Sequence, residues 1–235
     1  MADVTEEERF SFQLDPGGRI SLENINGDVV VNGEPGTEVE IVATKRADSR
    51  EDLERIEIKV AATERSIRVD TEHGKSENSW FGWNRGNSGS VHYELRVPSD
   101  AELDAIETVN GSIEIRGVAA PVTTSTVNGD LEVHGLAGDL RADTVNGSIE
   151  ATFDALASGQ RVNAESVNGS ITLVLPGNVG AEVEVETVNG SIDADDFGLE
   201  ADKGFVGRSL DGRIGDGGAR ISVDTVNGAV RIRKG

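Results

Sequence analysis

A six-residue motif centred on Asn-Gly recurs along this chain and limits the fold more than any other feature. Strong copies read TVNGSI, TVNGDL, SVNGSI or TVNGAV and begin at Thr108, Thr126, Thr144, Ser166, Thr187 and Thr225. A weaker copy, SLDGRI, begins at Ser209, and an earlier one surrounds Asn26. Copies recur roughly every 20 residues, a period typical of repeat proteins. A unit this short cannot bury its apolar face alone, so the copies must stack.

The residues on either side of each Asn-Gly alternate between apolar and polar, which is the period of a β-strand. In ISVDTVNGAVRI, for example, Ile221 and Val223 precede the turn, and Val230 and Ile232 follow it. Each copy is therefore expected to be two short strands joined by a turn at which both Asn and Gly tolerate positive φ. We predict an all-β fold: a single-stranded parallel β-helix, or β-solenoid, with coils of roughly 20 residues and an inserted antiparallel β meander near the N-terminus.

The chain divides into three predicted regions. Residues 1–33 form an N-terminal segment and the first coil, residues 34–100 the inserted meander with an aromatic loop at 76–90, and residues 101–235 the tandem coils. Within the insertion, SREDLER from Ser49 is expected to form a short helical turn with Ser49 as its N-cap. The last coil, TVNGAVRIRKG, ends in a strand with no evident cap, so the solenoid end is a candidate for self-association.

The order of these segments resembles a known family. A strand leading into NGDV, a charged segment ending in LRVP and then tandem TVNGSI units are similar to the bacterial putative-adhesin family of domain-of-unknown-function proteins, related to the head domain of putative autotransporter adhesins. The resemblance spans about Gly18 to Arg233. It implies a β-helical fold, an envelope setting and no established catalytic residues.

Stacked coils would align equivalent side chains in columns. The asparagines would form a structural ladder of amide hydrogen bonds, whose members are Asn26, Asn110, Asn128, Asn146, Asn168, Asn189 and Asn227. Counting by twos from apolar Val223 through Thr225 predicts that the Thr and Asn of each motif point inward. The valine between them, such as Val226, then points outward and adds to an apolar stripe, unless the chain kinks at the threonine.

Acidic residues would also align, for example Glu107 with Asp143 and Glu165. Two interpretations stay open: a solvated acidic face, or oxygen clusters that bind a hard cation such as Ca²⁺. The candidate metal ligands are Asp193, Asp195 and Asp196 in the segment DADDFGLEAD.

A Gly-, Ser- and Asn-rich loop, SENSWFGWNRGNSGS from Ser76, concentrates aromatic residues. Its candidate binding residues are Trp80, Phe81, Trp83, Asn84 and Arg85. Aromatic side chains on a loop can contact a sugar, a membrane interface or a protein partner. The alternative is that they fold back and plug the end of the solenoid.

Composition excludes several classes of function. A net charge of -21, from 43 acids and 22 bases, argues against a nucleic-acid partner. The sequence has no apolar run long enough for a membrane span, and MADVTEEERF does not read as a signal peptide. We expect a secreted, periplasmic or cell-surface protein whose signal has been removed, with a cytoplasmic location as the alternative.

The sequence favours a protein without catalytic activity or a cofactor. Its three histidines lie in unlike contexts, and no nucleophile-elbow motif is present. The leading hypothesis is an adhesin-like scaffold that binds an envelope protein, a peptide or a glycan. The alternatives are a self-assembling, filament-forming β-helix and a polysaccharide-active enzyme.

Overall fold

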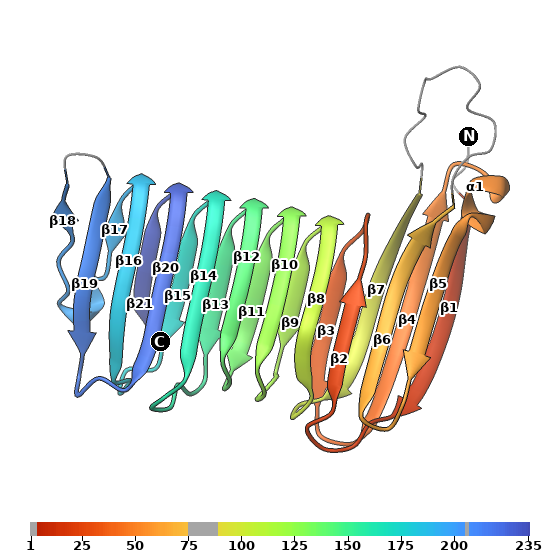
Figure 1. Cartoon of the computed structure of the whole chain (residues 1–235), viewed down its shortest axis with the longest axis horizontal. Helices are drawn as coiled ribbons and strands as arrows, with labels where there is room; N and C mark the ends of the chain where they lie inside the picture. Colours follow the sequence, from red (N-terminus) through yellow and green to blue (C-terminus); the bar gives the residue numbers. More distant parts are fainter. Residues whose placement is uncertain (1–3, 75–88, 205–206) are drawn as a thin grey trace.

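The computed structural model describes residues 4–74, 89–204 and 207–235, which form two facing β-sheets (Figure 1). Sheet A contains, in spatial order, β1 (Val4–Gln13), β4 (Glu38–Ala47), β7 (Gly89–Pro98), β3 (Val29–Glu34), β9 (Ile113–Arg116), β11 (Leu131–Leu136), β13 (Ile149–Phe153), β15 (Ile171–Leu175), β21 (Val230–Lys234) and β17 (Ile192–Asp193). The expected all-β class is confirmed.

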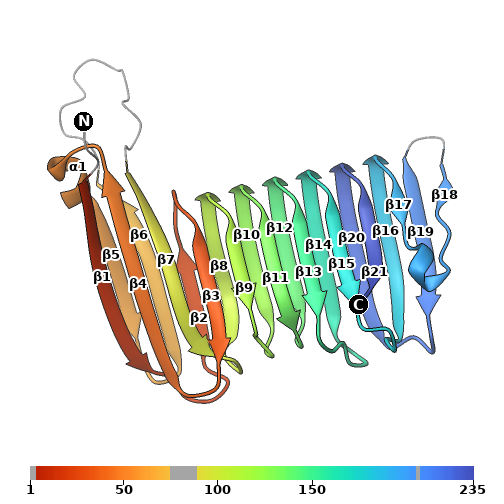
Figure 2. The ribbon, with the colours of Figure 1, turned by 180° about the vertical axis from the view of Figure 1, so that it is seen from behind.

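Sheet B faces sheet A along the whole stack, as the view from behind also shows (Figure 2). It contains, in spatial order, β18 (Asp202–Lys203), β19 (Arg208–Ile214), β16 (Ala181–Asn189), β20 (Ala219–Asn227), β14 (Arg161–Asn168), β12 (Leu140–Asn146), β10 (Val122–Asn128), β8 (Glu102–Asn110), β2 (Arg19–Glu23), β6 (Ser66–His73) and β5 (Ile56–Ala62).

Each repeat unit consists of a strand in sheet B, an Asn-Gly corner and a strand in sheet A. Neighbouring units pair in parallel and in the same register, so that Thr126 lies beside Thr144 in sheet B and Leu131 beside Ile149 in sheet A. The inward side chains of both sheets are mostly aliphatic, and those of the core are almost fully buried. Burying one such side chain contributes about 1.5–3 kcal/mol, so the core between the sheets is the main source of stability.

The order of the stacked units differs from their order in the sequence. The unit β20–β21 lies between β14–β15 and β16–β17, and it pairs in parallel with both neighbours in each sheet. The expectation that this last unit offers a free end is therefore wrong. Beyond β16, sheet B continues with the antiparallel strand β19, and the 3₁₀ helix η1 (Asp195–Phe197) follows β17.

The inserted segment contains the expected antiparallel pairs but is not a single meander. Strands β4 and β7 pair in sheet A, whereas β5 and β6 pair in sheet B. The helix α1 (Arg50–Glu54) connects β4 to β5, and Ser49 is its N-cap as predicted, accepting a hydrogen bond from the Asp52 amide. Each pair has one apolar face, and joining opposite sheets lets both faces line one core. Through β6 and β7, the pairs extend the sheets in parallel with β2 and β3.

Candidate binding groove

The threonine of each motif points inward, as the alternation predicted, and binds the neighbouring unit. Its hydroxyl donates to the carbonyl oxygen of the neighbouring corner glycine over 3.0–3.2 Å, with Ser166 taking the same role in its unit. Thr126 and Gly111 are one such pair. These residues are only 3–5% exposed, so their hydrogen bonds fix the corners of adjacent units against each other away from solvent.

The corner glycines are needed for close packing rather than for their backbone angles. In the repeat units that follow β8 the corner glycines do not have positive φ, and no asparagine among the described residues does, which corrects the turn chemistry expected from the sequence. A Cβ atom on Gly147 would overlap the carbonyl group of Gly129, and the same holds from unit to unit along the stack. The Asn-Gly pair therefore marks a column where backbones approach one another too closely for any side chain.

The asparagines form a continuous chain of side-chain hydrogen bonds. Each asparagine side chain donates its Nδ2 to the Oδ1 of the asparagine before it over 2.8–2.9 Å, and in stack order the members are Asn26, Asn110, Asn128, Asn146, Asn168, Asn227 and Asn189. The side chains are at the surface, not inward as the alternation predicted. The chain leaves the strand at the asparagine, so strict alternation ends one residue before it.

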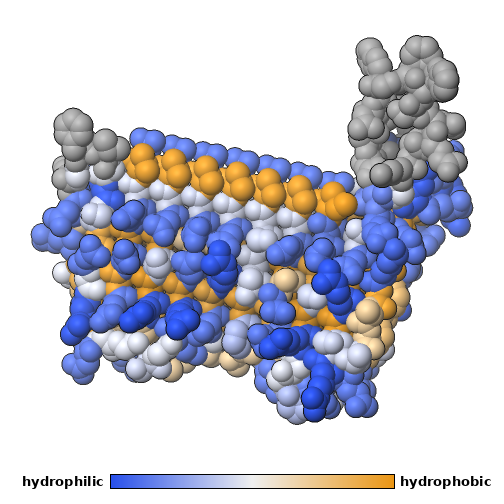
Figure 3. Space-filling model, viewed as in Figure 1, coloured by the Kyte–Doolittle hydropathy of each residue, from blue (hydrophilic) through white to orange (hydrophobic). Residues whose placement is uncertain are grey.

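The valines between threonine and asparagine form one exposed row. They are Val109, Val127, Val145, Val167, Val226 and Val188, and each is 39–46% exposed. Figure 3 shows this apolar row along the corner of the stack, interrupted by no polar side chain. We call it the valine stripe.

A column of acidic side chains runs beside the valine stripe on sheet B. In stack order its positions are Glu23, Glu107, Ser125, Asp143, Glu165, Asp224 and Glu186. The last four are all acids, and the position of β20 between β14 and β16 places Asp224 between Glu165 and Glu186. We call this row the acidic column.

Two carboxyl groups in the acidic column have raised pKa values. Burial is the main reason that the pKa of Asp224 is raised, and the charges of Glu186 and Glu165 add to it. Burial also raises the pKa of Asp143, against the opposing charge of Arg141, whose Nε lies 3.0 Å from its carboxylate. Crowded carboxylates thus resist ionisation where the column is densest.

The valine stripe and the acidic column line one groove with a volume of about 1090 Å³. It runs from Glu23 and Asn24 to Gly207 and Arg208. Among its described lining residues, only Arg141 and Arg208 are basic. The groove therefore presents an apolar surface with a strongly negative flank, and we call it the corner groove.

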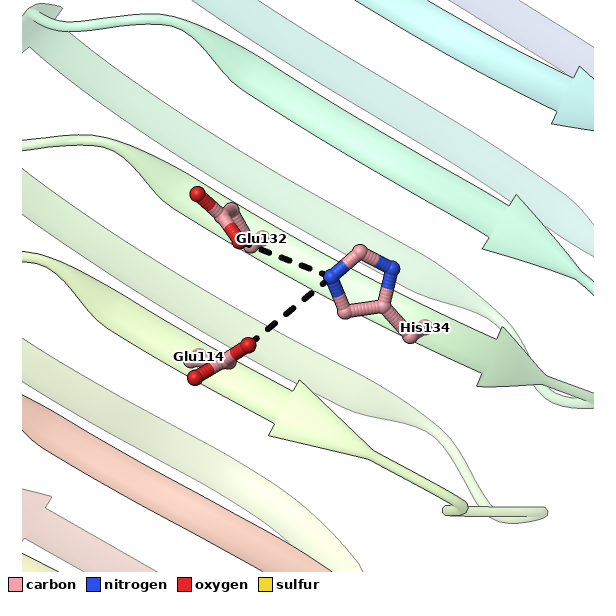
Figure 4. A group of neighbouring side chains, drawn as sticks. All are labelled: Glu114, Glu132 and His134. Atoms are coloured by element: carbon pink, nitrogen blue, oxygen red, sulfur yellow. Dashed lines mark ion pairs between the residues drawn. The ribbon is translucent and has the colours of Figure 1, made fainter.

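A second cluster lies on sheet A, away from the corner groove. His134 Nε2 is 3.5 Å from Glu132 and 3.9 Å from Glu114 (Figure 4). The ligand atoms of the three residues lie within 4.8 Å of one another, but Glu114 also pairs with Arg116. None of these three residues is among the site residues predicted from the sequence.

Besides the asparagine ladder, the sequence predicted an aromatic binding loop and a metal-ion site. Trp80, Phe81, Trp83, Asn84 and Arg85 lie outside the described residues. The metal-ion site at Asp193, Asp195 and Asp196 stays a prediction.

In this acidic segment, Asp193 accepts two hydrogen bonds from Arg233, over 3.0 and 2.7 Å, which lowers the pKa of its carboxyl group. Asp196 accepts the backbone amide of Lys234. These contacts bind β17 and η1 to β21.

A family model described as Toastrack DUF4097 matches residues 18–233. The chain belongs to the Toastrack family. This Toastrack chain is also similar to a putative cell adhesion protein from Clostridium sporogenes, at 14% identity and a TM-score of 0.49, covering 98% of this chain and 100% of the other. No curated protein matches the sequence.

Two further solved structures are similar to the Toastrack chain. A putative adhesin from Bacteroides fragilis is 10% identical, with a TM-score of 0.34 and 97% coverage of both chains. A putative lipid binding protein from Parabacteroides distasonis is 13% identical, with a TM-score of 0.35 and 96% coverage of both chains. Within the described part of the Toastrack chain, no helix has the length and apolar character needed to cross a membrane.

Proposed function

We propose that this Toastrack protein is a non-catalytic, adhesin-like β-solenoid scaffold of the bacterial envelope or cell surface, and that the corner groove is its contact surface for a partner. The observation that carries the proposal is the alignment of the valine stripe with the acidic column in one continuous groove. Contiguous exposed apolar rows on a soluble protein mark interaction surfaces more often than isolated exposed residues do.

The motif contacts support a rigid surface. Each valine is held between a buried threonine, which bonds the neighbouring unit, and an asparagine of the ladder. Adjacent strands lie about 4.8 Å apart, so the valines are presented at a fixed, regular spacing. Rigid presentation lowers the entropy lost on binding.

The groove chemistry supports a binding role over nucleophilic catalysis. Its described lining includes hydroxyl groups, such as that of Ser125, but no histidine or lysine that could activate them. Activation of such a nucleophile requires an adjacent base.

Co-sedimentation with isolated envelopes of Clostridium sporogenes and Bacteroides fragilis tests this proposal. The groove variant Val127→Ser/Val145→Ser/Val167→Ser should bind at least about ten-fold more weakly than the wild type, since each lost apolar contact lowers the binding free energy. The matched control Val30→Ser/Val174→Ser alters outward-facing valines of sheet A. Wild-type-like binding by the groove variant, or no sedimentation of the wild type with either envelope, would overturn the proposal.

A further inference from the structure

The corner groove combines two surfaces whose chemistry identifies a class of partner. We infer that it takes a cationic amphipathic α-helix of a partner protein, with apolar residues on the valine stripe and Lys or Arg side chains along the acidic column. This inference rests on the proposed function, because it names the partner of the same groove.

Charge complementarity requires a basic partner. Glu165, Asp224 and Glu186 are adjacent in the stack, and burial together with neighbouring acids raises the pKa of Asp224. A neutral or acidic partner would cover these carboxylates without pairing them, which carries a large desolvation cost. A row of Lys or Arg side chains would pair with them and relieve their mutual repulsion.

The same argument disfavours a second copy of this chain. Two corner grooves packed face to face would bring two acidic columns together, in chains that each carry a net charge of -21. Like charges across an interface suppress association. The occupant must therefore be a different polypeptide segment.

The backbone of the corner favours a helix over an extended strand. The groove runs across the strands, and the corner amides already bond between units, as Gly129 N does to Asn146 O over 3.1 Å and Gly147 N to Asn168 O over 3.1 Å. An extended peptide lying along the valine stripe would find no strand edge for its own amides and carbonyls. A helix pairs these groups within itself, so it can cover an apolar row without leaving backbone hydrogen bonds unmade.

The dimensions of the stripe set the length of the partner. Six valines spaced by about 4.8 Å span about 24 Å, which corresponds to about 16 residues of helix at 1.5 Å per residue. One helical turn rises about 5.4 Å, so one apolar side chain per turn stays close to the spacing of the valines.

The two flanks of the stripe set the pattern of charges on the partner. The acidic column lies on one flank of the valine stripe, and the uncharged asparagine ladder lies on the other. The matching helix has basic residues on one side of its apolar face and uncharged polar residues on the opposite side.

Isothermal titration with a designed 18-residue peptide tests the inference. The peptide carries one leucine per turn, lysines on one flank and glutamines elsewhere. Its controls are a scrambled peptide of equal composition and a version with glutamate in place of lysine. We expect saturable binding by the designed peptide, at least about ten-fold tighter than by either control. Circular dichroism at 222 nm should show helix formation on binding, against the low helical background of this all-β protein.

Two protein variants with equal charge changes locate the binding. Glu165→Gln/Asp224→Asn/Glu186→Gln neutralises the densest part of the acidic column, and Glu114→Gln/Glu132→Gln/Glu150→Gln neutralises three stacked acids on sheet A. We expect the first to weaken peptide binding at least about ten-fold and the second less than about two-fold. Equal losses, or equal binding of the scrambled peptide, would overturn the inference.

The envelope assay separates failure of this inference from failure of the proposed function. If the designed peptide does not bind but the valine variant loses envelope binding, the groove is a contact surface and the helical partner class is wrong. If the valine variant keeps full envelope binding as well, both the inference and the proposed function are wrong.

Discussion

The repeat units and the N-terminal strands extend the same two sheets but are stabilised in different ways. From β8 to β21, every unit repeats one set of contacts: a buried hydroxyl, a bare glycine corner and an asparagine bond. In the N-terminal strands the contacts are individual. Tyr93 and Thr71 share a buried hydrogen bond of 2.7 Å, and Lys45 pairs with Glu8. The comparison teaches that the repeats depend on uniform columns, whereas the N-terminal strands depend on particular pairs.

The junction between the two regions uses one exchanged residue. At the motif position of the threonine, the first unit has Asn24, which is buried. Its amide donates to the carbonyl oxygens of Gly27, over 3.1 Å, and Val91, over 2.9 Å. Asn24 therefore replaces the threonine and hydrogen-bonds the backbone of β7, a strand that has no Asn-Gly corner.

Filling the glycine column should have the largest effect. Gly147→Ala places a methyl group against the Gly129 backbone, which can move only if two units separate. We expect a loss of more than about 3 kcal/mol in the free energy of unfolding, measured by urea denaturation. The matched control, Gly74→Ala at the end of β6, has ordinary contacts and should change stability by less than about 0.5 kcal/mol. Similar stabilities of the two variants would show that the backbones at the glycine corners can move apart to accommodate a side chain.

Removing one hydroxyl in each region compares their buried hydrogen bonds. Thr71→Val leaves the buried Tyr93 hydroxyl without this partner and should cost about 1–3 kcal/mol. Burial is also what raises the pKa of Tyr93 to about 12. Thr144→Val removes the bond to Gly129 O and should cost about 1 kcal/mol. Thermal unfolding of both variants measures the difference, and a larger loss for Thr144→Val would reverse the comparison.

Breaking the asparagine ladder should have a smaller effect that depends on position. Asn146→Ala removes two ladder bonds inside the stack, and Asn189→Ala removes one at the end of the ladder. Because these bonds are at the surface, we expect losses of about 1 kcal/mol and about half of that, respectively. Urea denaturation provides the measurement. Equal losses would mean that the ladder bonds do not act individually.

Neutralising one acid should give the smallest effect, with a defined pH dependence. The raised pKa of Asp224 means that the folded state binds more protons than the unfolded state. Stability therefore falls as pH rises from the ordinary aspartate range through the raised pKa. Asp224→Asn should be more stable than the wild type at pH 7, and the difference should shrink toward pH 4. Melting temperatures across this range test the trend, with Glu132→Gln on sheet A as the charge control.

The sequence predicted what depends on each unit alone. The alternation around Thr225 gave the correct orientation for the threonines and for the valine stripe. The alternation was wrong for the asparagines, because the strand ends at that residue. The turn chemistry expected for Asn-Gly was wrong for the φ angles of the corner glycines, because their role is close contact with the next unit.

The sequence could not predict what depends on the order of the units. Every interface between units offers the same threonine, asparagine and glycine contacts, so the repeats do not specify which unit is the neighbour of which. Asp224 lies between Glu165 and Glu186 only because β20 lies between β14 and β16. The order of the acids in the densest part of the groove could therefore not be predicted from the sequence.

The position of β20–β21 has a consequence for how the chain is completed during synthesis. Residues 219–234 leave the ribosome after residues 181–214, yet they lie inside the stack, between strands that are already made. A nascent chain that folds one unit at a time must either hold β16–β17 apart or stack it on β14–β15 and later release it. Translation must therefore proceed beyond β16 before this part of the stack can reach its final arrangement.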